Sequence, residues 1–236
     1  MHRHTIPAAL IELLEKVDTP TVCNAIEVVH GRRGFNQFTR GTMQHCRPGM
    51  PAMVGRARTA RIAGLAPPIE SDEIIKTRRL EYFRAMAREP GQTVAVIEDL
   101  DYPNCIAGWW GEVHVAVHKG LGLKGAITNG VMRDLDVIDD EFPILAGSIG
   151  PSHGFVHVRD LGVQVSIIGM QVNEDDLIHG DRHGALVIPE EVIPELEKAI
   201  GTVVANENLI LGPARQPDFN IEKLEAAWAN FEARRT

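Results

Sequence analysis

The residues best suited to chemistry lie in two short stretches near the middle of the chain. The first is Gly108-Trp-Trp-Gly111-Glu112-Val-His114, and the second is Arg133-Asp134. Glycines ahead of an expected helix leave backbone N–H groups exposed, and the helix N-terminus adds partial positive charge, so this point suits a carboxylate. An arginine can stabilise a developing enolate charge, and an aspartate can hold a hard cation such as Mg²⁺.

The elements that must position these stretches follow an alternating pattern. Thr93–Ile97 predicts a buried strand ending in Glu98-Asp99, and Gly125–Gly130 predicts a short strand ahead of Arg133-Asp134. Between them, Gly111–Lys119 fits a strand by its alternating valines and a helix by a shared apolar face. We favour a helix, because the segment joins two expected parallel strands. Ligands of open α/β folds bind beyond the strand ends, so both stretches should meet at one edge.

The remaining pattern predicts an α/β fold in a single domain, residues 1–236. Its fold class includes helices at both the N- and C-terminal ends. The expected helices cover residues 10–17, 19–29, 71–89 and about 218–234, the last with an apolar stripe of Ile221, Leu224, Trp228 and Phe231 suited to its own core or a subunit interface. The expected strands cover residues 54–62, 156–158, 163–168 and 185–188, and residues 31–52 form a long irregular excursion. The arginines of the strand at 54–62 are expected to be solvated.

Composition excludes several classes of protein. With 44% hydrophobic and 24% charged residues, the chain has an ordinary globular composition. The net charge of −8 argues against nucleic-acid binding, and the absence of a long apolar segment, including after Met1–His4, predicts a cytoplasmic protein with no membrane partner. The widely spaced cysteines Cys23, Cys46 and Cys105 indicate reduced thiols that serve in packing.

Longer motifs around these stretches resemble a known family. They are Gly111-Glu112, then Gly125-Ala-Ile-Thr-Asn129-Gly130-Val-Met-Arg133-Asp134, Phe142-Pro143-Ile144, Gly180-Asp181-Arg-His-Gly184-Ala-Leu-Val-Ile188-Pro189 and Thr19-Pro-Thr-Val-Cys-Asn-Ala-Ile26. The run is similar to the 4-hydroxy-4-methyl-2-oxoglutarate aldolases, a family that also includes the regulator of ribonuclease E activity (RraA-like). Its most specific element is an acidic residue followed, after twenty positions, by Arg-Asp.

The resemblance implies a swivelling β/β/α fold, assembly as a homotrimer or a dimer of trimers, and a site at the subunit interface. It implies that the backbone N–H groups of Gly111, Glu112, Val113 and His114 bind a pyruvate-like carboxylate. Arg133 would contact the oxo oxygen, Asp134 would ligate Mg²⁺ or Mn²⁺, and Glu112 would orient a metal-bound water that carries protons. A glutamate from a neighbouring subunit's C-terminal region is also implied, and Glu207 is the candidate for it.

The sequence departs from the family pattern at several positions. Glu112 and Asn129 stand where aspartate is common, and Glu174-Asp175-Asp176 replaces a Pro-Gly-Asp turn. Val137 stands where a small residue is frequent. These departures leave Arg133 and Asp134 in place and bear on the identity of the substrate.

Other candidate residues have plainer interpretations. The pairs His114/His118 and His179/His183 have the spacing of metal ligands on a helix, but no third ligand accompanies them, so solvated or interface histidines are expected. Trp109 and Trp110 are more consistent with core or interface packing than with a pocket wall. The chain contains neither a nucleotide-binding glycine loop after a strand nor a nucleophile elbow.

The leading hypothesis is therefore a metal-dependent lyase that cleaves a small 2-oxo dicarboxylic acid, such as 4-hydroxy-4-methyl-2-oxoglutarate or oxaloacetate, by retro-aldol cleavage or decarboxylation and releases pyruvate. No lysine lies within the motif to form a Schiff base, since Lys119 and Lys124 only flank it. The alternative is a non-catalytic protein that regulates a ribonuclease by contact. Methyl transfer to a quinone rests only on older names given to members of the family.

Overall fold

The structure is a computed structural model that describes residues 5–234, so Met1–His4 lie outside it. The chain divides into two compact units. The larger comprises Leu14–Thr19 and Gln37–Pro189, and the smaller contains Pro20–Asn36, the chain from Glu190 onward and the described residues before Leu14. The α/β fold class predicted from the sequence is confirmed, with helices at the N- and C-terminal ends. The prediction of one domain over 1–236 stays a prediction.

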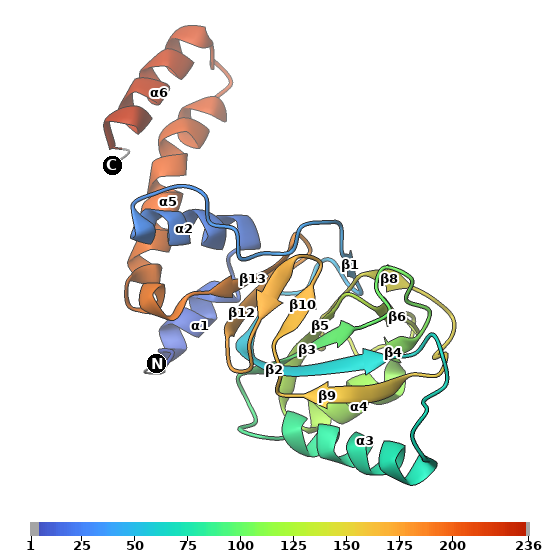
Figure 1. The fold of residues 1–236 in the computed structure, drawn as a ribbon. Helices are drawn as coiled ribbons and strands as arrows, with labels where there is room; N and C mark the ends of the chain where they lie inside the picture. The colour runs from blue at the N-terminus through green and yellow to red at the C-terminus, as the bar shows by residue number, and fades with distance from the viewer. Residues whose placement is uncertain (1–4, 235–236) are drawn as a thin grey trace. The chain divides into compact units, whose positions relative to one another are not determined.

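The larger unit is built around an eight-stranded mixed sheet (Figure 1). Its order is β1-β7-β5-β3-β2-β12-β13, and β9 pairs with β2 beside this path. The strands are β1 (Gln44–His45), β2 (Met53–Ala63), β3 (Thr93–Asp99), β5 (Leu123–Thr128), β7 (Ile144–Ala146), β9 (His157–Leu161), β12 (Leu177–Asp181) and β13 (Gly184–Ile188). β2, β3, β5 and β7 are parallel to their neighbours in this set, so their carboxyl ends lie at one edge.

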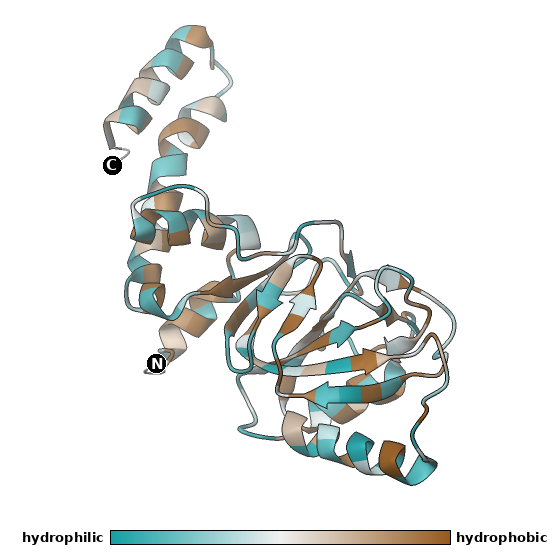
Figure 2. Cartoon of the chain, in the orientation of Figure 1, coloured by the Kyte–Doolittle hydropathy of each residue, from teal (hydrophilic) through white to brown (hydrophobic). Residues whose placement is uncertain are grey.

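Both faces of the parallel strands are covered, which explains the apolar run Thr93–Ile97 in β3. One face packs against α3 (Asp72–Met86) and α4 (Glu112–Gly120), which bury Tyr82 and Val115 in a shared core. The antiparallel hairpin of β10 (Val165–Ile167) and β11 (Met170–Val172) covers the other face. In Figure 2 the strands carry both hydrophobic and hydrophilic segments, and α3 likewise alternates between hydrophilic and hydrophobic residues. A layer on each side therefore keeps water from the sheet.

A second, small parallel sheet lies beside the main one. It consists of β4 (Gly108–Trp110), β6 (Val131–Met132) and β8 (Ser148–Ile149), in the order β4-β6-β8. The chain enters it directly from β5, through Asn129 and Gly130. This sheet was not predicted from the sequence, because strands this short carry no measurable hydrophobic period.

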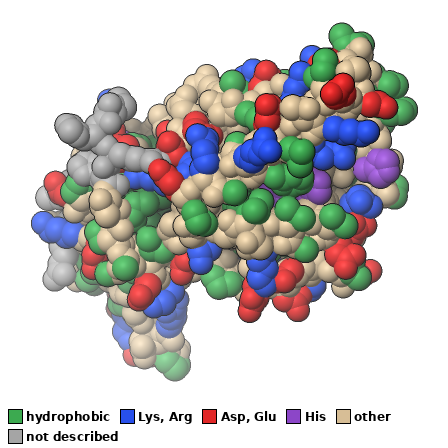
Figure 3. Space-filling model, turned by 90° about the horizontal axis from the view of Figure 1, so that it is seen from below, with side chains coloured by type: hydrophobic (Ala, Val, Ile, Leu, Met, Phe, Trp, Pro, Cys, Tyr) green, Lys and Arg blue, Asp and Glu red, His purple; other side chains and the backbone are tan. Residues whose placement is uncertain are grey.

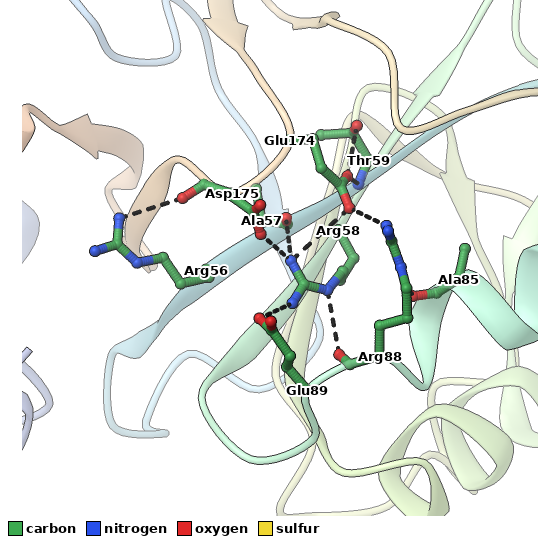
Figure 4. A network of polar contacts seen from close by, with 9 residues as sticks. All are labelled: Arg56, Ala57, Arg58, Thr59, Ala85, Arg88, Glu89, Glu174 and Asp175. Atoms are coloured by element: carbon green, nitrogen blue, oxygen red, sulfur yellow. Dashed lines mark hydrogen bonds and ion pairs between the residues drawn. The ribbon is translucent and has the colours of Figure 1, made fainter. Parts of the chain in front are cut away.

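Arg58 forms the centre of a polar network in the larger unit (Figure 4). Its side chain is only 3% exposed and pairs with Asp175 and with Glu89, at 3.0 Å. Glu174 accepts from the backbone N–H of Thr59 at 2.7 Å, which fastens the turn after β11 to β2. The prediction of solvated arginines on this strand is wrong for Arg56 and Arg58, because acidic and carbonyl oxygens reach them from the neighbouring turn and helix end.

The smaller unit is helical. It contains α2 (Thr19–His30) beyond its first residue, most of α1 (Ala8–Leu14), the 3-10 turn Glu190–Val192, α5 (Ile193–Ala214) and α6 (Ile221–Arg234). α6 packs on α5, and the stripe predicted for the C-terminal helix is only partly covered: Ile221 is 65% and Trp228 50% exposed. Within residues 5–234 no helix is long and apolar enough to cross a membrane. Acidic and basic side chains are intermingled on the face shown in Figure 3.

Most predicted elements are present with small shifts in their ends. The helix expected at 71–89 ends at Met86, and the segment at 111–119 is helical as we favoured. The strands expected at 156–158, 163–168 and 185–188 correspond to β9, β10 and β13. The three cysteines are half-buried and form no disulfide bond with one another. β11, β12 and the full length of α5 were not delimited by the sequence pattern.

Candidate active site

Arg133 and Asp134 emerge from the small sheet immediately after β6. The backbone N–H of Arg133 donates to the carbonyl of Trp110 at 2.8 Å, which extends the pairing of β6 with β4. This bond places Arg133 beside Gly111, the residue that precedes α4. The two stretches singled out in the sequence are therefore brought together by one pair of short parallel strands.

The two side chains lie next to each other and remain open to solvent. Arg133 Nη1 is 3.3 Å from Asp134 Oδ1, and the side chains are 31% and 30% exposed. Asp134 has a φ of +62°, and its carbonyl accepts from the N–H groups of Val137 and Ile138 at 3.0 and 3.1 Å. A left-handed conformation is uncommon for a residue with a side chain, although aspartate tolerates it better than most. The turn that follows thus holds Asp134 in a conformation that a free chain would seldom adopt.

Glycines make room for this pair. A Cβ at Gly111 would lie 2.4 Å from Asp134 Oδ2 and 3.1 Å from Arg133 Cγ, and a Cβ at Gly108 would lie 3.0 Å from Arg133 Cδ. Gly111 has an extended backbone with a φ of −160°, which any residue can adopt. The requirement for glycine at position 111 is therefore one of space beside Asp134.

The N-terminus of α4 faces the carboxylate of Asp134. The N–H of Glu112 lies 3.3 Å from Asp134 Oδ2, and the first intrahelical bond runs from Val115 to the carbonyl of Gly111 at 3.0 Å. The N–H groups of Val113 and His114 precede this bond and so have no acceptor within the helix. With the helix dipole, this turn provides a second locus of positive potential beside Arg133.

The side chains of the first turn differ in their surroundings. Glu112 and Val113 are exposed. His114 is half-buried, with its ring 4.2 Å from that of Trp109, and burial is the main cause that lowers its pKa to about 3. Nearby positive charge, including that of Arg133, acts in the same direction. His114 is therefore neutral at physiological pH.

His118 is fully buried, so the expectation of a solvated or interface histidine is wrong for it. Its Nε2 lies 2.6 Å from the hydroxyl of Tyr82, and burial lowers its pKa to about 4. His179 is likewise buried, with Nε2 2.9 Å from the carbonyl of Leu14. Both histidines pack in the interior because hydroxyl and carbonyl groups satisfy their ring nitrogens. Trp109 and Trp110 are also buried, as core packing requires.

Among the described residues, no group of three or more His, Cys, Asp or Glu side chains could enclose a metal. Asp134 is a single, partly exposed carboxylate, and its oxygens lie 3.3 Å from both Arg133 Nη1 and the backbone nitrogen of Glu112. Mg²⁺ usually binds proteins through one or two carboxylates and keeps several waters. The donor set at Asp134 is compatible with such an open site.

The sequence-predicted site residues fall into two places. Gly111, Glu112, Val113, His114, Arg133 and Asp134 form one continuous group in the larger unit. Glu207 belongs to α5 in the smaller unit, where it lines a pocket of about 520 Å³ whose lining residues all come from that unit. Its role as the cross-subunit acid stays a prediction.

Sequence reasoning assigned no structural role to Asn129 and Asp99, which bond to each other at the ends of β5 and β3. Asn129 is 4% exposed and bonds through its carboxamide to the backbone of Asp99. Asp99 is 1% exposed, its Oδ2 has no partner among the described residues, and burial raises its pKa. Their position could have indicated this pairing, because both residues lie at the carboxyl ends of adjacent parallel strands.

The comparison with protein families agrees with this arrangement. The model of the RraA-like family, described as Aldolase/RraA, matches residues 19–187. The chain belongs to this family. Residues 19–187 include every predicted site residue except Glu207.

Individual relatives are distant. A protein of Halalkalibacterium halodurans, provisionally named 4-hydroxy-4-methyl-2-oxoglutarate aldolase, is 27% identical over 165 residues, 67% of this chain and 71% of that protein. An uncharacterized protein of Methanocaldococcus jannaschii is 32% identical over 89 residues. The match spans 37% of this chain and 43% of the M. jannaschii protein, so it extends over less than half of either one.

Solved structures share the fold at low sequence identity. Streptomyces coelicolor RraAS2, described as an unusual member of the RNase ES inhibitor RraA family, superposes with a TM-score of 0.65 at 19% identity, covering 92% of this chain and all of that one. An uncharacterized protein from Pseudomonas syringae has a TM-score of 0.67 at 20% identity, covering 95% and 99%. The RraA-like fold is thereby established.

Proposed function

We propose that the protein is a divalent-metal-dependent carbon–carbon lyase that cleaves a small 2-oxo dicarboxylic acid and releases pyruvate. The observation that carries this proposal is the solvent-open pairing of Arg133 with Asp134 beside the N-terminus of α4. The family includes aldolases, and one relative bears the name of that activity. The assembly that would bring a neighbouring subunit's acid to the site, a homotrimer or a dimer of trimers, is part of the same proposal.

Each residue of the site has a role that its position supports. The N–H groups of Val113 and His114 would bind the substrate carboxylate, since they have no acceptor within the helix. Arg133 would stabilise the negative charge that collects on the oxo oxygen as the carbon–carbon bond breaks. The Nε–H of Arg133 is buried and lacks an acceptor among the described residues, and an oxygen of the bound substrate would satisfy it.

Asp134 would hold the divalent cation, Mg²⁺ or Mn²⁺. When bound, the cation would supply Lewis-acid polarisation of the oxo oxygen. Glu112 is exposed at the start of the helix, where its carboxylate can hold a water molecule. In the retro-aldol reaction, that water would take the proton from the C4 hydroxyl group, which becomes a carbonyl as the C3–C4 bond breaks. It would then return a proton to C3 of the resulting enolate, which becomes the methyl carbon of pyruvate.

The test is pyruvate release from oxaloacetate and from 4-hydroxy-4-methyl-2-oxoglutarate, measured with Mg²⁺, with Mn²⁺ and with a chelator. We expect the chelator to abolish release, and Asp134→Asn to lower kcat/KM by at least about 100-fold, because the amide is a weak ligand for a hard cation. Asp136→Asn is the matched control, since Asp136 is an exposed carboxylate two positions away.

Pyruvate release that survives both the chelator and Asp134→Asn would contradict the proposal. If the pure protein released none from either substrate, the alternative of a non-catalytic regulator would be favoured, and binding to a ribonuclease would be the next measurement.

A further inference from the structure

The chain leaves the main sheet for the small sheet at Asn129 and Gly130. Thr128 is the last residue of β5, and Val131 is the first residue of β6. Arg133 and Asp134 follow directly on the far side of β6. Whatever fixes the crossing therefore sets the direction in which these two residues leave the sheet.

The carboxamide of Asn129 fixes the crossing from one side. Its Oδ1 accepts from the backbone N–H of Asp99 at 2.6 Å, and its Nδ2 donates to the backbone carbonyl of Asp99 at 3.0 Å. Both bonds go to the last residue of β3, so the side chain acts as one more rung between β3 and β5. An amide can make both bonds because it carries a donor and an acceptor.

Close packing fixes the crossing from the other sides. Gly130 donates to Thr128 Oγ1 at 2.9 Å, and Ser148 donates to the carbonyl of Gly130 at 3.1 Å. A Cβ at Gly147 would lie 2.1 Å from the carbonyl oxygen of Asn129, so the two backbones are in direct contact. The crossing has no room to shift while the carboxamide bonds are intact.

We propose that Asn129 is a positioning residue for the Arg133–Asp134 site, acting through its paired hydrogen bonds to the backbone of Asp99. Its effect on turnover rests on the proposed function, whereas its effect on geometry does not. A displacement of about 1 Å in a catalytic group can cost about 100-fold in rate, so loss of the carboxamide rung should lower kcat well before the fold is lost.

The substitution Asn129→Asp tests the hydrogen-bond pattern itself. A neutral carboxylic acid has one donor and one acceptor, like the amide, and can make both bonds. A carboxylate has no donor, so one of its oxygens would lie against the carbonyl oxygen of Asp99 without a hydrogen bond. The variant should therefore be impaired at high pH and recover as the new carboxyl group is protonated. A buried carboxyl next to a carbonyl favours its neutral form, which brings this recovery into an accessible range of pH.

The ionisable groups that face this position come from the end of β3 and the loop after it. They are Asp99, whose backbone bonds Asn129, and the two groups that interact with the Asp99 carboxyl, Asp101 and Cys105. Burial and the neighbouring acids raise the pKa of the Cys105 thiol to about 12. The same groups are present in wild type and in every variant. The ratio of variant to wild-type activity at each pH therefore isolates the introduced carboxyl group.

The experiment measures kcat and KM for pyruvate release between about pH 8 and about pH 5.5, the range in which a buried carboxyl can titrate. We expect Asn129→Ala to lower kcat by about 10- to 100-fold at every pH. The ratio for Asn129→Asp should rise as pH falls, by up to about tenfold per pH unit. Two variants serve as controls: Asn104→Asp, at an exposed asparagine, and Val96→Ala, a core truncation in β3 that lowers stability without touching the carboxamide.

Crystal structures of wild type and Asn129→Asp at both ends of the pH range give a readout that needs no turnover. Arg133 and Asp134 should move relative to Gly111 at high pH and return at low pH. A flat activity ratio together with an unmoved Arg133–Asp134 pair would overturn the inference. An inactive wild type would refute the proposed function alone, since the crystallographic comparison would still decide the role of Asn129.

Discussion

At the scale of single residues, the site depends on two glycines as much as on Arg133 and Asp134. Gly108 and Gly111 leave the space that the side chains of Arg133 and Asp134 occupy. Gly111 is also the N-cap residue of α4, the helix whose first N–H groups lie at the same place. One residue without a side chain thus connects the first turn of α4, where we propose that the substrate carboxylate binds, with Asp134, the candidate metal ligand.

Gly111→Ala should therefore impair the site more than the fold. The new Cβ would lie 2.4 Å from Asp134 Oδ2, while the extended backbone of Gly111 accepts alanine without strain. We expect kcat/KM for pyruvate release to fall by about 100-fold as the carboxylate is displaced. Gly120→Ala in the same helix is the control, because nothing lies within 4 Å of its Cβ position. Equal activity of the two variants in steady-state kinetics would show that the space beside Gly111 is not needed.

At the scale of elements, the network around Arg58 joins β2, the end of α3 and the turn before β12. Asp175 in that turn has a φ of +73°. A left-handed backbone conformation costs an aspartate conformational free energy that it does not cost a glycine. Here the carboxylate of Asp175 forms an ion pair with Arg58. The turn therefore depends on an ion pair as well as on local backbone preference.

Arg58→Met should lower the free energy of unfolding by about 2–3 kcal/mol. The value lies below the range for a fully buried pair because Asp175 and Glu89 are 41% and 70% exposed and can regain water. Arg61→Met, which removes a half-exposed arginine that pairs with Glu98 on the neighbouring strand, should cost less than about 1 kcal/mol. Urea denaturation of both variants checks the difference, and equal losses would mean that burial of Arg58 adds nothing to stability.

At the scale of the whole molecule, buried histidines make the folded state sensitive to acid. His114, His118 and His179 have pKa values lowered by burial, so they stay neutral in the folded protein and take up a proton on unfolding when the pH is below about 6.5. Their contribution is present above the unfolded pKa of about 6.5 and is lost as pH falls below it. Hydrogen bonds from His183 and Thr19 outweigh burial and lower the pKa of Asp181, whose contribution is lost at still lower pH.

Stability should therefore fall between pH 6.5 and 4, with His118 alone accounting for a loss on the order of 3 kcal/mol by pH 4. The free energy of unfolding, measured by urea denaturation across this range, checks the slope. His118→Phe should flatten the slope, because the buried titrating group is gone. His153→Gln, at an exposed histidine, should leave it unchanged. A wild-type stability that stays constant from pH 6.5 to 4 would contradict the expectation.

The sequence by itself determined the elements whose pattern is local. The strand at Thr93–Asp99 follows from a run of neighbouring residues, and the Arg133-Asp134 motif was visible without coordinates. The helix at Glu112–Gly120 was favoured over a strand only because its segment joins two expected parallel strands. Residue type and spacing along one segment were enough for the strand and the motif. The family was also evident from such segments.

Only the tertiary structure decided which residues that are distant in sequence contact one another. The burial of Arg58 and His118, the carboxamide rung between Asn129 and Asp99, and the placement of Glu207 in the smaller unit all depend on contacts between residues far apart in sequence. A side chain's type states which bonds it can make but not whether a partner is in reach. Whether a polar group stays solvated or becomes buried is therefore set by the packing of distant segments.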